Sequence, residues 1–173
     1  LLGDRFEILA VSTAAHLLRI PIAHIGGGDV TEGSYDDAMR DCISRMASVH
    51  FVTSTSAMAR LSHMGIRNVH LVGNPGIDYI RNAQWRGPRP YIEPYVVVSY
   101  QPETIDGTNE IEKVIASLPE GKFPLFIMPN PDRGSAEIAE RIRRYQLEAH
   151  MACGVCDFLP HNEFLNTLSH CDL

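Results

Sequence analysis

The sequence alternates short apolar runs with longer amphipathic stretches, and this order constrains the fold more than any other feature. Apolar runs bounded by glycine or proline are typical of buried strands, and parallel strands need a crossover, usually a helix, between them. The alternation therefore predicts an α/β fold, with parallel sheets covered by helices on both faces. Predicted strands occupy residues 20–25, 49–53, 69–72, 95–100 and 124–128. Predicted helices occupy residues 6–19, 35–47, 54–64, 109–118, 135–147 and 161–168.

A proline-rich segment divides this alternation into two series. Three prolines stand within residues 88–94, and proline lacks the N–H that a helix interior or a central strand requires. Because strands and helices resume after this segment, we expect two Rossmann-like domains. Residues 1–82 form part of the first, residues 83–94 a stiff linker, and residues 95–173 part of the second.

Both ends of the chain interrupt predicted strands. Leu1 and Leu2 look like the last residues of a buried strand and are not preceded by an initiator methionine, while the last residues stop where a strand is expected to begin. We therefore interpret the chain as an internal fragment in which both Rossmann-like domains are incomplete.

Composition excludes several classes of protein. The chain has 15 Lys+Arg against 21 Asp+Glu, a formal net charge of -6, so it lacks the basic face that sequence-independent nucleic-acid binding requires. Its hydrophobic content of 45% is that of a globular protein, and no apolar run reaches the roughly 20 residues that span a bilayer. Four cysteines are too few for a disulfide scaffold, which predicts a reducing, cytoplasmic location.

Polar residues follow the predicted strands of the first domain. In open parallel sheets the ligand lies beyond the carboxyl ends of the strands, so these residues are the first candidates for a site. The i,i+4 spacing of Asp36 and Arg40 predicts an ion pair. Each aspartate could instead only cap or charge the first turn of a helix, and residues 26–28, all glycine, could be a flexible turn or a close approach to a ligand. The candidates are Asp4, Arg5, Asp29, Asp36, Asp37 and Arg40.

The second domain offers fewer signals. Residues 129–135 follow a predicted strand and open a helix, which suits an anion or ribose site near Asn130 or a plain loop capped by Ser135. Cys153 and Cys156 form a CxxC pair, but no second pair or standard histidine spacing accompanies it, so we predict no metal. There is no glycine-rich phosphate motif either, and we predict no cofactor.

Taken in order, several motifs resemble those of the UDP-N-acetylglucosamine 2-epimerases. They are GDRFE at residues 3–7, HIGGGDVTEG at residues 24–33 and DDxxR at residues 36–40. The hydrolysing branch, which forms N-acetylmannosamine, is the most similar. Further matches lie at residues 43–46, 50–51, 64–65, 72–78 and 129–135.

The resemblance implies two Rossmann-like domains in a GT-B-like architecture that binds UDP-N-acetylglucosamine. UDP would leave by elimination after loss of the proton on the sugar C2, and water would then add. It also implies a homo-oligomer with no cofactor, no metal, and no nucleic-acid or membrane partner.

The resemblance also implies roles for individual residues. Asp4 and Asp36 match catalytic positions, and Arg40 would hold the Asp36 carboxylate in place with support from Asp29 and Asp37. Two positions depart from the family pattern. Gln101 stands where a histidine is expected and cannot exchange a proton, and Gly26 stands where many members carry Glu or His. Two alternatives stay open: a diverged nucleotide-sugar-binding protein without turnover, and a GT-B glycosyltransferase. The residues implied to contact the nucleotide or substrate are Arg5, Gln101, Asn130, Asp132 and Leu159.

Overall fold

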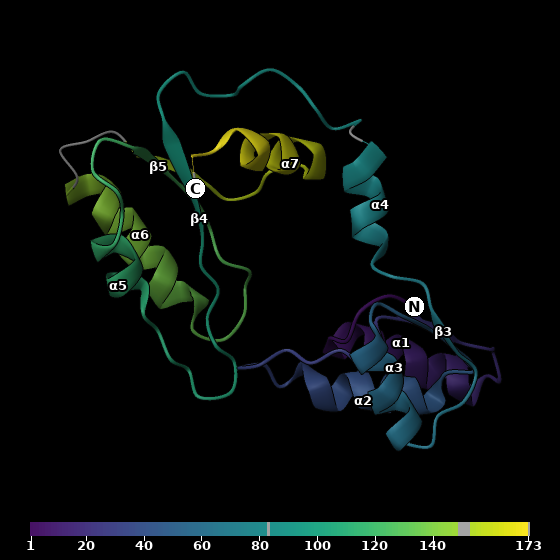
Figure 1. Cartoon of the computed structure of the whole chain (residues 1–173). Helices are drawn as coiled ribbons and strands as arrows, with labels where there is room; N and C mark the ends of the chain where they lie inside the picture. The colour runs from purple at the N-terminus through teal and green to yellow at the C-terminus, as the bar shows by residue number, and fades with distance from the viewer. Residues whose placement is uncertain (83, 149–152, 173) are drawn as a thin grey trace. The chain divides into compact units, whose positions relative to one another are not determined.

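The computed structural model of the chain describes residues 1–82, 84–148 and 153–172 (Figure 1). The chain divides into two units, Leu1–Tyr79 and Ile80–Leu173. Each unit has its own three-stranded parallel sheet, in the orders β1-β2-β3 and β4-β5-β6. The expected α/β fold with two Rossmann-like parallel sheets is therefore confirmed. We keep the domain limits 1–82 and 95–173, with 83–94 as linker, as a proposal, and residue 83 lies outside the described residues.

The first unit builds its sheet from three short strands with helices between them. The strands pair in parallel, and His24 in β1 lies opposite His50 in β2. Leu2 forms an isolated parallel bridge with Ile25, so the start of the chain lies beside β1. The elements are α1 (Phe6–Leu17), β1 (Ala23–Ile25), α2 (Asp36–Met46), β2 (Val49–Val52), α3 (Thr55–His63) and β3 (Val69–Leu71).

Local sequence explains how α3 is formed and held. Ser54 is its N-cap and accepts a hydrogen bond from the Ala57 N–H at 3.1 Å, and Gly65 follows its end with φ +75°. Ala57 and Leu61 are buried and pack with Val52 of β2 into a small apolar cluster. One face of α3 therefore packs against the sheet of the first unit.

The second unit has a larger apolar core. Figure 1 shows α5 and α6 on one side of its sheet and α7 on the other. Apolar residues of β4, β5, α5 and α6, with one residue just after β5, form the core: Val98, Ile111, Phe126, Met128, Ile138 and Ile142. The elements are α4 (Pro75–Asn82), which begins in the first unit, β4 (Tyr95–Ser99), α5 (Ile111–Ala116), β5 (Phe123–Ile127), α6 (Ser135–Glu148), β6 (Gly154–Cys156) and α7 (His161–His170).

Two elements were not predicted from the sequence. Helix α4 begins within a cluster of turn residues, because Pro75 suits the first position of a helix and the Asn74 side chain accepts from the Gly76 N–H at 2.9 Å. Strand β6 has only three residues and contains a glycine. A Cβ at Gly154 would lie 2.8 Å from the end of the Leu125 side chain, so a larger residue there would displace side chains of the neighbouring strand.

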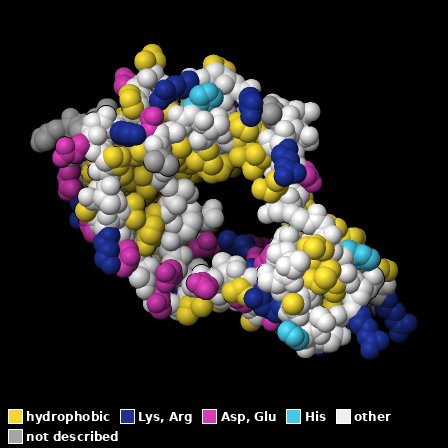
Figure 2. All heavy atoms as spheres, viewed as in Figure 1, with side chains coloured by type: hydrophobic (Ala, Val, Ile, Leu, Met, Phe, Trp, Pro, Cys, Tyr) yellow, Lys and Arg dark blue, Asp and Glu magenta, His cyan; other side chains and the backbone are white. Residues whose placement is uncertain are grey.

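No helix in the described parts of the chain is long and apolar enough to cross a bilayer. Figure 2 shows Lys and Arg side chains interspersed with Asp and Glu on the visible face. Mixed charge of this kind agrees with the acidic net charge and gives no sign of a basic groove among the residues seen there.

Candidate active site

A cavity of about 310 Å³ opens at the carboxyl ends of the strands of the first unit. Its walls come from the segments that follow β1, β2 and β3 and from α2, as the topology of a parallel sheet predicts. Both polar and apolar side chains line it, at the lower end of the size range of ligand pockets. The lining residues are Leu2, Gly3, Asp4, Ile25, Gly26, Asp29, Thr31, Arg40, Thr53, Asn74 and Pro75.

Arg40 is the buried centre of this site. The residue is only 3% exposed, and its Nη2 donates to the Asp4 carboxylate and, at 2.8 Å, to Thr31 Oγ1. Its Nη1 donates to the Asp37 carboxylate and, at 2.6 Å, to the Asp29 carbonyl oxygen. Burial alone would lower the pKa of Arg40, but the hydrogen bonds and charges of Asp4 and Asp37 raise it overall. One guanidinium thus ties together three segments of the chain: the loop before α1, the loop after β1 and the first turns of α2.

The predicted pairing of Arg40 with Asp36 is wrong. Arg40 pairs with Asp37, three residues earlier in α2, and with Asp4, which lies far away in sequence. Asp36 instead accepts from the Ser34 hydroxyl at 2.6 Å, while its own N–H donates to Ser34 Oγ at 3.2 Å. Helical spacing allows either aspartate to meet Arg40, and the position of Asp4 decides which one does.

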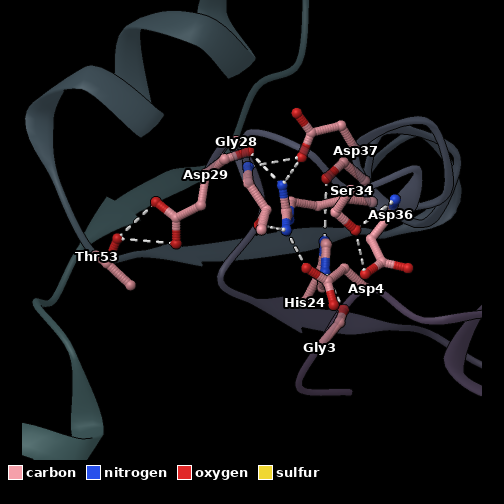
Figure 3. A network of polar contacts seen from close by, with 12 residues as sticks. Gly3, Asp4, His24, Gly28, Asp29, Ser34, Asp36, Asp37 and Thr53 are labelled. Atoms are coloured by element: carbon pink, nitrogen blue, oxygen red, sulfur yellow. Dashed lines mark hydrogen bonds and ion pairs between the residues drawn. The ribbon is translucent and has the colours of Figure 1, made fainter. Parts of the chain in front are cut away.

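Asp29 joins the loop after β1 to the end of β2. Both of its carboxylate oxygens lie within hydrogen-bond distance of Thr53 Oγ1, at 2.8 and 3.1 Å, and share one hydroxyl proton. The structure therefore brings Asp4, Asp29 and Asp37 together around Arg40 at one edge of the sheet (Figure 3). Asp36 lies one residue before Asp37, bonded to Ser34, and is not among the described residues that line the cavity. The catalytic roles of these residues stay predictions.

The three consecutive glycines differ in what surrounds them. A Cβ at Gly27 would lie 2.8 Å from Ser44 Oγ and 2.9 Å from His24 Nδ1, and a Cβ at Gly28 would lie 2.5 Å from a backbone oxygen of α3. At Gly26 the nearest atom is an oxygen of Asp29, 3.9 Å away. Contacts within the protein thus require glycine at 27 and 28, whereas Gly26 faces open space.

Sequence reasoning missed a pair of buried histidines beneath the site. His24 and His50 are 0% and 1% exposed, and their rings meet edge to face with centroids 6.5 Å apart. Burial lowers the pKa of both imidazoles, so both are neutral near pH 7. No local pattern reveals this pair, because it depends on the register between β1 and β2.

In the second unit, the candidate residues also follow the carboxyl ends of strands. Gln101 comes after β4, Asn130 and Asp132 after β5, and Leu159 after β6. The Gln101 side-chain oxygen accepts a hydrogen bond from the Asn130 N–H at 2.9 Å, which joins the first two of these segments. Arg5, in the first unit, is the N-cap residue of α1, and its Nε lies 3.6 Å from Glu7.

The CxxC pair lies at β6. Cys156 donates its thiol proton to the Phe158 carbonyl oxygen at 3.0 Å, and burial raises the pKa of Cys153. In the described ranges, no group of three or more His, Cys, Asp or Glu side chains could hold a metal ion. The pair thus lacks further ligands of these types among the described residues.

Comparisons with known proteins identify the family of the chain. A family model described as UDP-N-acetylglucosamine 2-epimerase matches residues 1–173. The chain is 30% identical to the UDP-N,N'-diacetylbacillosamine 2-epimerase (hydrolyzing) of Legionella pneumophila, over 100% of this chain and 49% of that protein. It is 29% identical to the GDP/UDP-N,N'-diacetylbacillosamine 2-epimerase (hydrolyzing) of Campylobacter jejuni, over 88% of this chain and 44% of that protein.

A solved structure is similar over the same extent. The crystal structure of UDP-GlcNAc 2-epimerase from Neisseria meningitidis bound to UDP-GlcNAc gives a TM-score of 0.72 at 16% identity, covering 98% of this chain and 51% of that one. Similarity at this identity establishes the fold. The chain spans about half the length of the relatives that it matches.

Proposed function

The chain belongs to the UDP-N-acetylglucosamine 2-epimerase family, and from this membership we propose that the full-length protein is a hydrolysing 2-epimerase of a UDP-linked 2-acetamido sugar. The names of the Legionella and Campylobacter relatives support the hydrolysing reaction. The observation that carries the proposal is the group of carboxylates held around Arg40 at the carboxyl ends of the strands.

The proposed reaction needs both a base and an acid. A base removes the proton on C2, the bond between C1 and the UDP oxygen breaks, and a C1=C2 double bond forms. Water then adds its oxygen to C1, and a proton returns to C2 from the opposite face. The products are UDP and the free 2-epimeric sugar, and carboxylates are suited to both proton transfers.

The geometry suggests how two carboxylates take these roles. Arg40 binds Oδ2 of Asp4, and within the described residues Oδ1 has no protein partner, so that oxygen can face a sugar in the cavity. Asp36 is held by Ser34 rather than by a cation, in a different electrostatic environment. We assign the two proton transfers to Asp4 and Asp36, with Arg40, Asp37 and Asp29 positioning them.

The second unit supplies candidate groups for the nucleotide. The Gln101 oxygen is occupied by the Asn130 N–H, so the Gln101 amide NH2 is directed to donate to an acceptor such as a diphosphate oxygen. We assign Asn130, Asp132 and Arg5 to the nucleotide and Leu159 to the uracil face. We also propose a cytoplasmic homo-oligomer that uses no cofactor, as the family resemblance implies.

UDP-N-acetylglucosamine is the first substrate to test. The names of two relatives favour UDP-N,N'-diacetylbacillosamine as a second candidate, since the C2 chemistry is the same and only substituents elsewhere on the ring differ. The full-length protein should be incubated with each in deuterium oxide, and UDP and the free sugar followed by NMR. We expect one of them to yield UDP and a 2-epimeric sugar with deuterium at C2.

Other products would identify the alternatives. Formation of the epimeric UDP-sugar without free sugar would indicate a non-hydrolysing epimerase. Binding without turnover would indicate a diverged nucleotide-sugar-binding protein, and transfer to an added acceptor sugar would indicate a glycosyltransferase. Each of these three results would overturn the proposal.

Replacement of the carboxylates tests the residue assignments. We expect Asp4→Asn and Asp36→Asn each to lower UDP release about 1,000-fold, because an amide cannot transfer the proton. Asp41→Asn is the matched control, since Asp41 lies on the same helix and takes no part in the described hydrogen bonds that hold Asp4 and Asp36. If either Asp4→Asn or Asp36→Asn kept a tenth or more of the turnover, that assignment would be wrong.

A further inference from the structure

His24 joins three parts of the first unit. It lies in β1 with its side chain fully buried, and its Nδ1 lies 3.0 Å from Ser44 Oγ of α2. Its Nε2 lies 3.1 Å from the Gly3 carbonyl oxygen, in the residue just before Asp4 (Figure 3). The imidazole therefore spans from the helix that carries Arg40 to the loop that carries Asp4.

The chemistry of these partners fixes where the proton lies on the ring. A carbonyl oxygen can only accept, so His24 Nε2 must carry the proton and donate it to Gly3. Because burial lowers the pKa of His24, the ring is neutral and its Nδ1 accepts from the Ser44 hydroxyl. Both ring nitrogens thus have a partner of matching type.

The packing around the ring leaves little room for movement. A Cβ at Gly27 would overlap both Ser44 Oγ and His24 Nδ1, so the ring and the hydroxyl fill the space above that glycine. Gly3 has φ +106°, a conformation that other residues rarely adopt, so its carbonyl points in a direction that an ordinary strand end would not give. His24 contacts this carbonyl directly.

We propose that His24, oriented by Ser44, is a positioning residue that holds the Gly3 carbonyl and thereby places the Asp4 carboxylate for proton transfer. This role rests on the proposed function for the reaction it serves. Arg40 holds the side chain of Asp4, whereas His24 holds the backbone just before it. The two contacts together define the position of the carboxylate.

Two amide substitutions separate the two ring contacts. In His24→Gln the side-chain nitrogen can occupy the place of Nε2 and still donate to Gly3. In His24→Asn the shorter amide can accept from Ser44 but cannot reach Gly3. We expect His24→Asn to lower kcat about 100-fold with KM nearly unchanged, and His24→Gln to restore kcat to within about fivefold of the wild type.

A second readout does not depend on turnover. Hydrogen exchange at the amides of residues 3–5, measured by NMR on the full-length protein, should be faster in His24→Asn than in His24→Gln. His50→Asn is the matched control for removal of a buried imidazole, because His50 is equally buried on the next strand. Its ring meets His24 only edge to face, so its loss leaves the hydrogen bonds of His24 to Ser44 and Gly3 in place. We expect His50→Asn to leave kcat and this exchange within about twofold of the wild type.

The two readouts distinguish failure of this inference from failure of the proposed function. If the wild type releases no UDP, the proposed function fails, and the exchange measurement still decides whether His24 holds the loop. If His24→Gln and His24→Asn lose kcat equally and show the same exchange at residues 3–5, or if His50→Asn matches His24→Asn, the positioning role of His24 is wrong.

Discussion

The two units share a three-stranded parallel sheet but bury different groups around it. In the second unit, the apolar cluster contains Phe126 and Ile138, and Thr167 is its one buried polar residue among those described. In the first unit, the apolar cluster is only Val52, Ala57 and Leu61. Its buried polar residues are Ser12, His24, Arg40, Ser44 and His50.

The kind of residue buried in each unit corresponds to how that unit holds the candidate site residues at its strand ends. Buried polar groups generally need partners, and for His24 and Arg40 those partners lie in the loops of the candidate active site. The network therefore fixes the positions of the site residues. Its contribution to the free energy of unfolding is smaller than that expected of an apolar interior of the same size. The second unit holds its candidate residues on a sheet supported mainly by apolar packing.

The largest effect is expected from the apolar core of the second unit. Phe126→Ala should lower its free energy of unfolding by about 4 kcal/mol, because the ring is fully buried and its loss leaves a cavity. Hydrogen exchange in β4 and β5 during urea denaturation measures this loss. Phe158→Ala, at a side chain 76% exposed, is the control and should change little. Equal effects of the two substitutions would contradict the idea that apolar packing supports this unit.

Removal of the buried cation should have the next largest effect, now in the first unit. Arg40→Met should lower its stability by about 3 kcal/mol, because Asp4 and Asp37 would lose their shared partner. We place it at the low end of the range because both carboxylates are partly exposed. Exchange in β1 and β2 measures it, with Arg45→Met, an exposed position of the same helix, as control. A stabilised Arg40→Met variant would show that the network serves the site at the expense of stability.

The smallest expected difference between the two units is the response of their stability to acid. Burial lowers the pKa of His24 and His50 in the folded state, so below about pH 6.5 the unfolded chain binds more protons than the folded one. The stability of the first unit should therefore fall as the pH drops from 7.5 to 5.5 and show no such dependence above that window. Exchange in β1 and β2, corrected for its intrinsic pH dependence, should increase more than exchange in β4 and β5. An equal response of both sheets would refute this expectation.

Much of the fold could be predicted because strands and helices have local signatures. The start of α3 is marked in sequence by Ser54 and its end by Gly65, and the structure places both where those residue types belong. Helix α4 was missed because Pro75 and Gly76 also suit a turn, and β6 because three residues are too few to show a period.

The site could be predicted only in part, for a similar reason. Strand ends identified Asp4 and Asp29 as candidates for one site, because parallel topology alone brings these segments together. The choice between Asp36 and Asp37 as the partner of Arg40 depends on Asp4, which no helical spacing reveals. The pairing of His24 with His50 depends on strand register, which is also absent from local sequence.

The contrast among the three consecutive glycines has a consequence for how this site can change over evolution. Any side chain at Gly27 or Gly28 would collide with the protein's own atoms, so these two positions are closed to variation. Gly26 has open space around it, although its φ of +84° is a strained conformation for any residue with a side chain, and least so for Asn or Asp. Of these three neighbouring positions, only Gly26 leaves room for selection or protein engineering to add a functional group to the cavity without first repacking the interior.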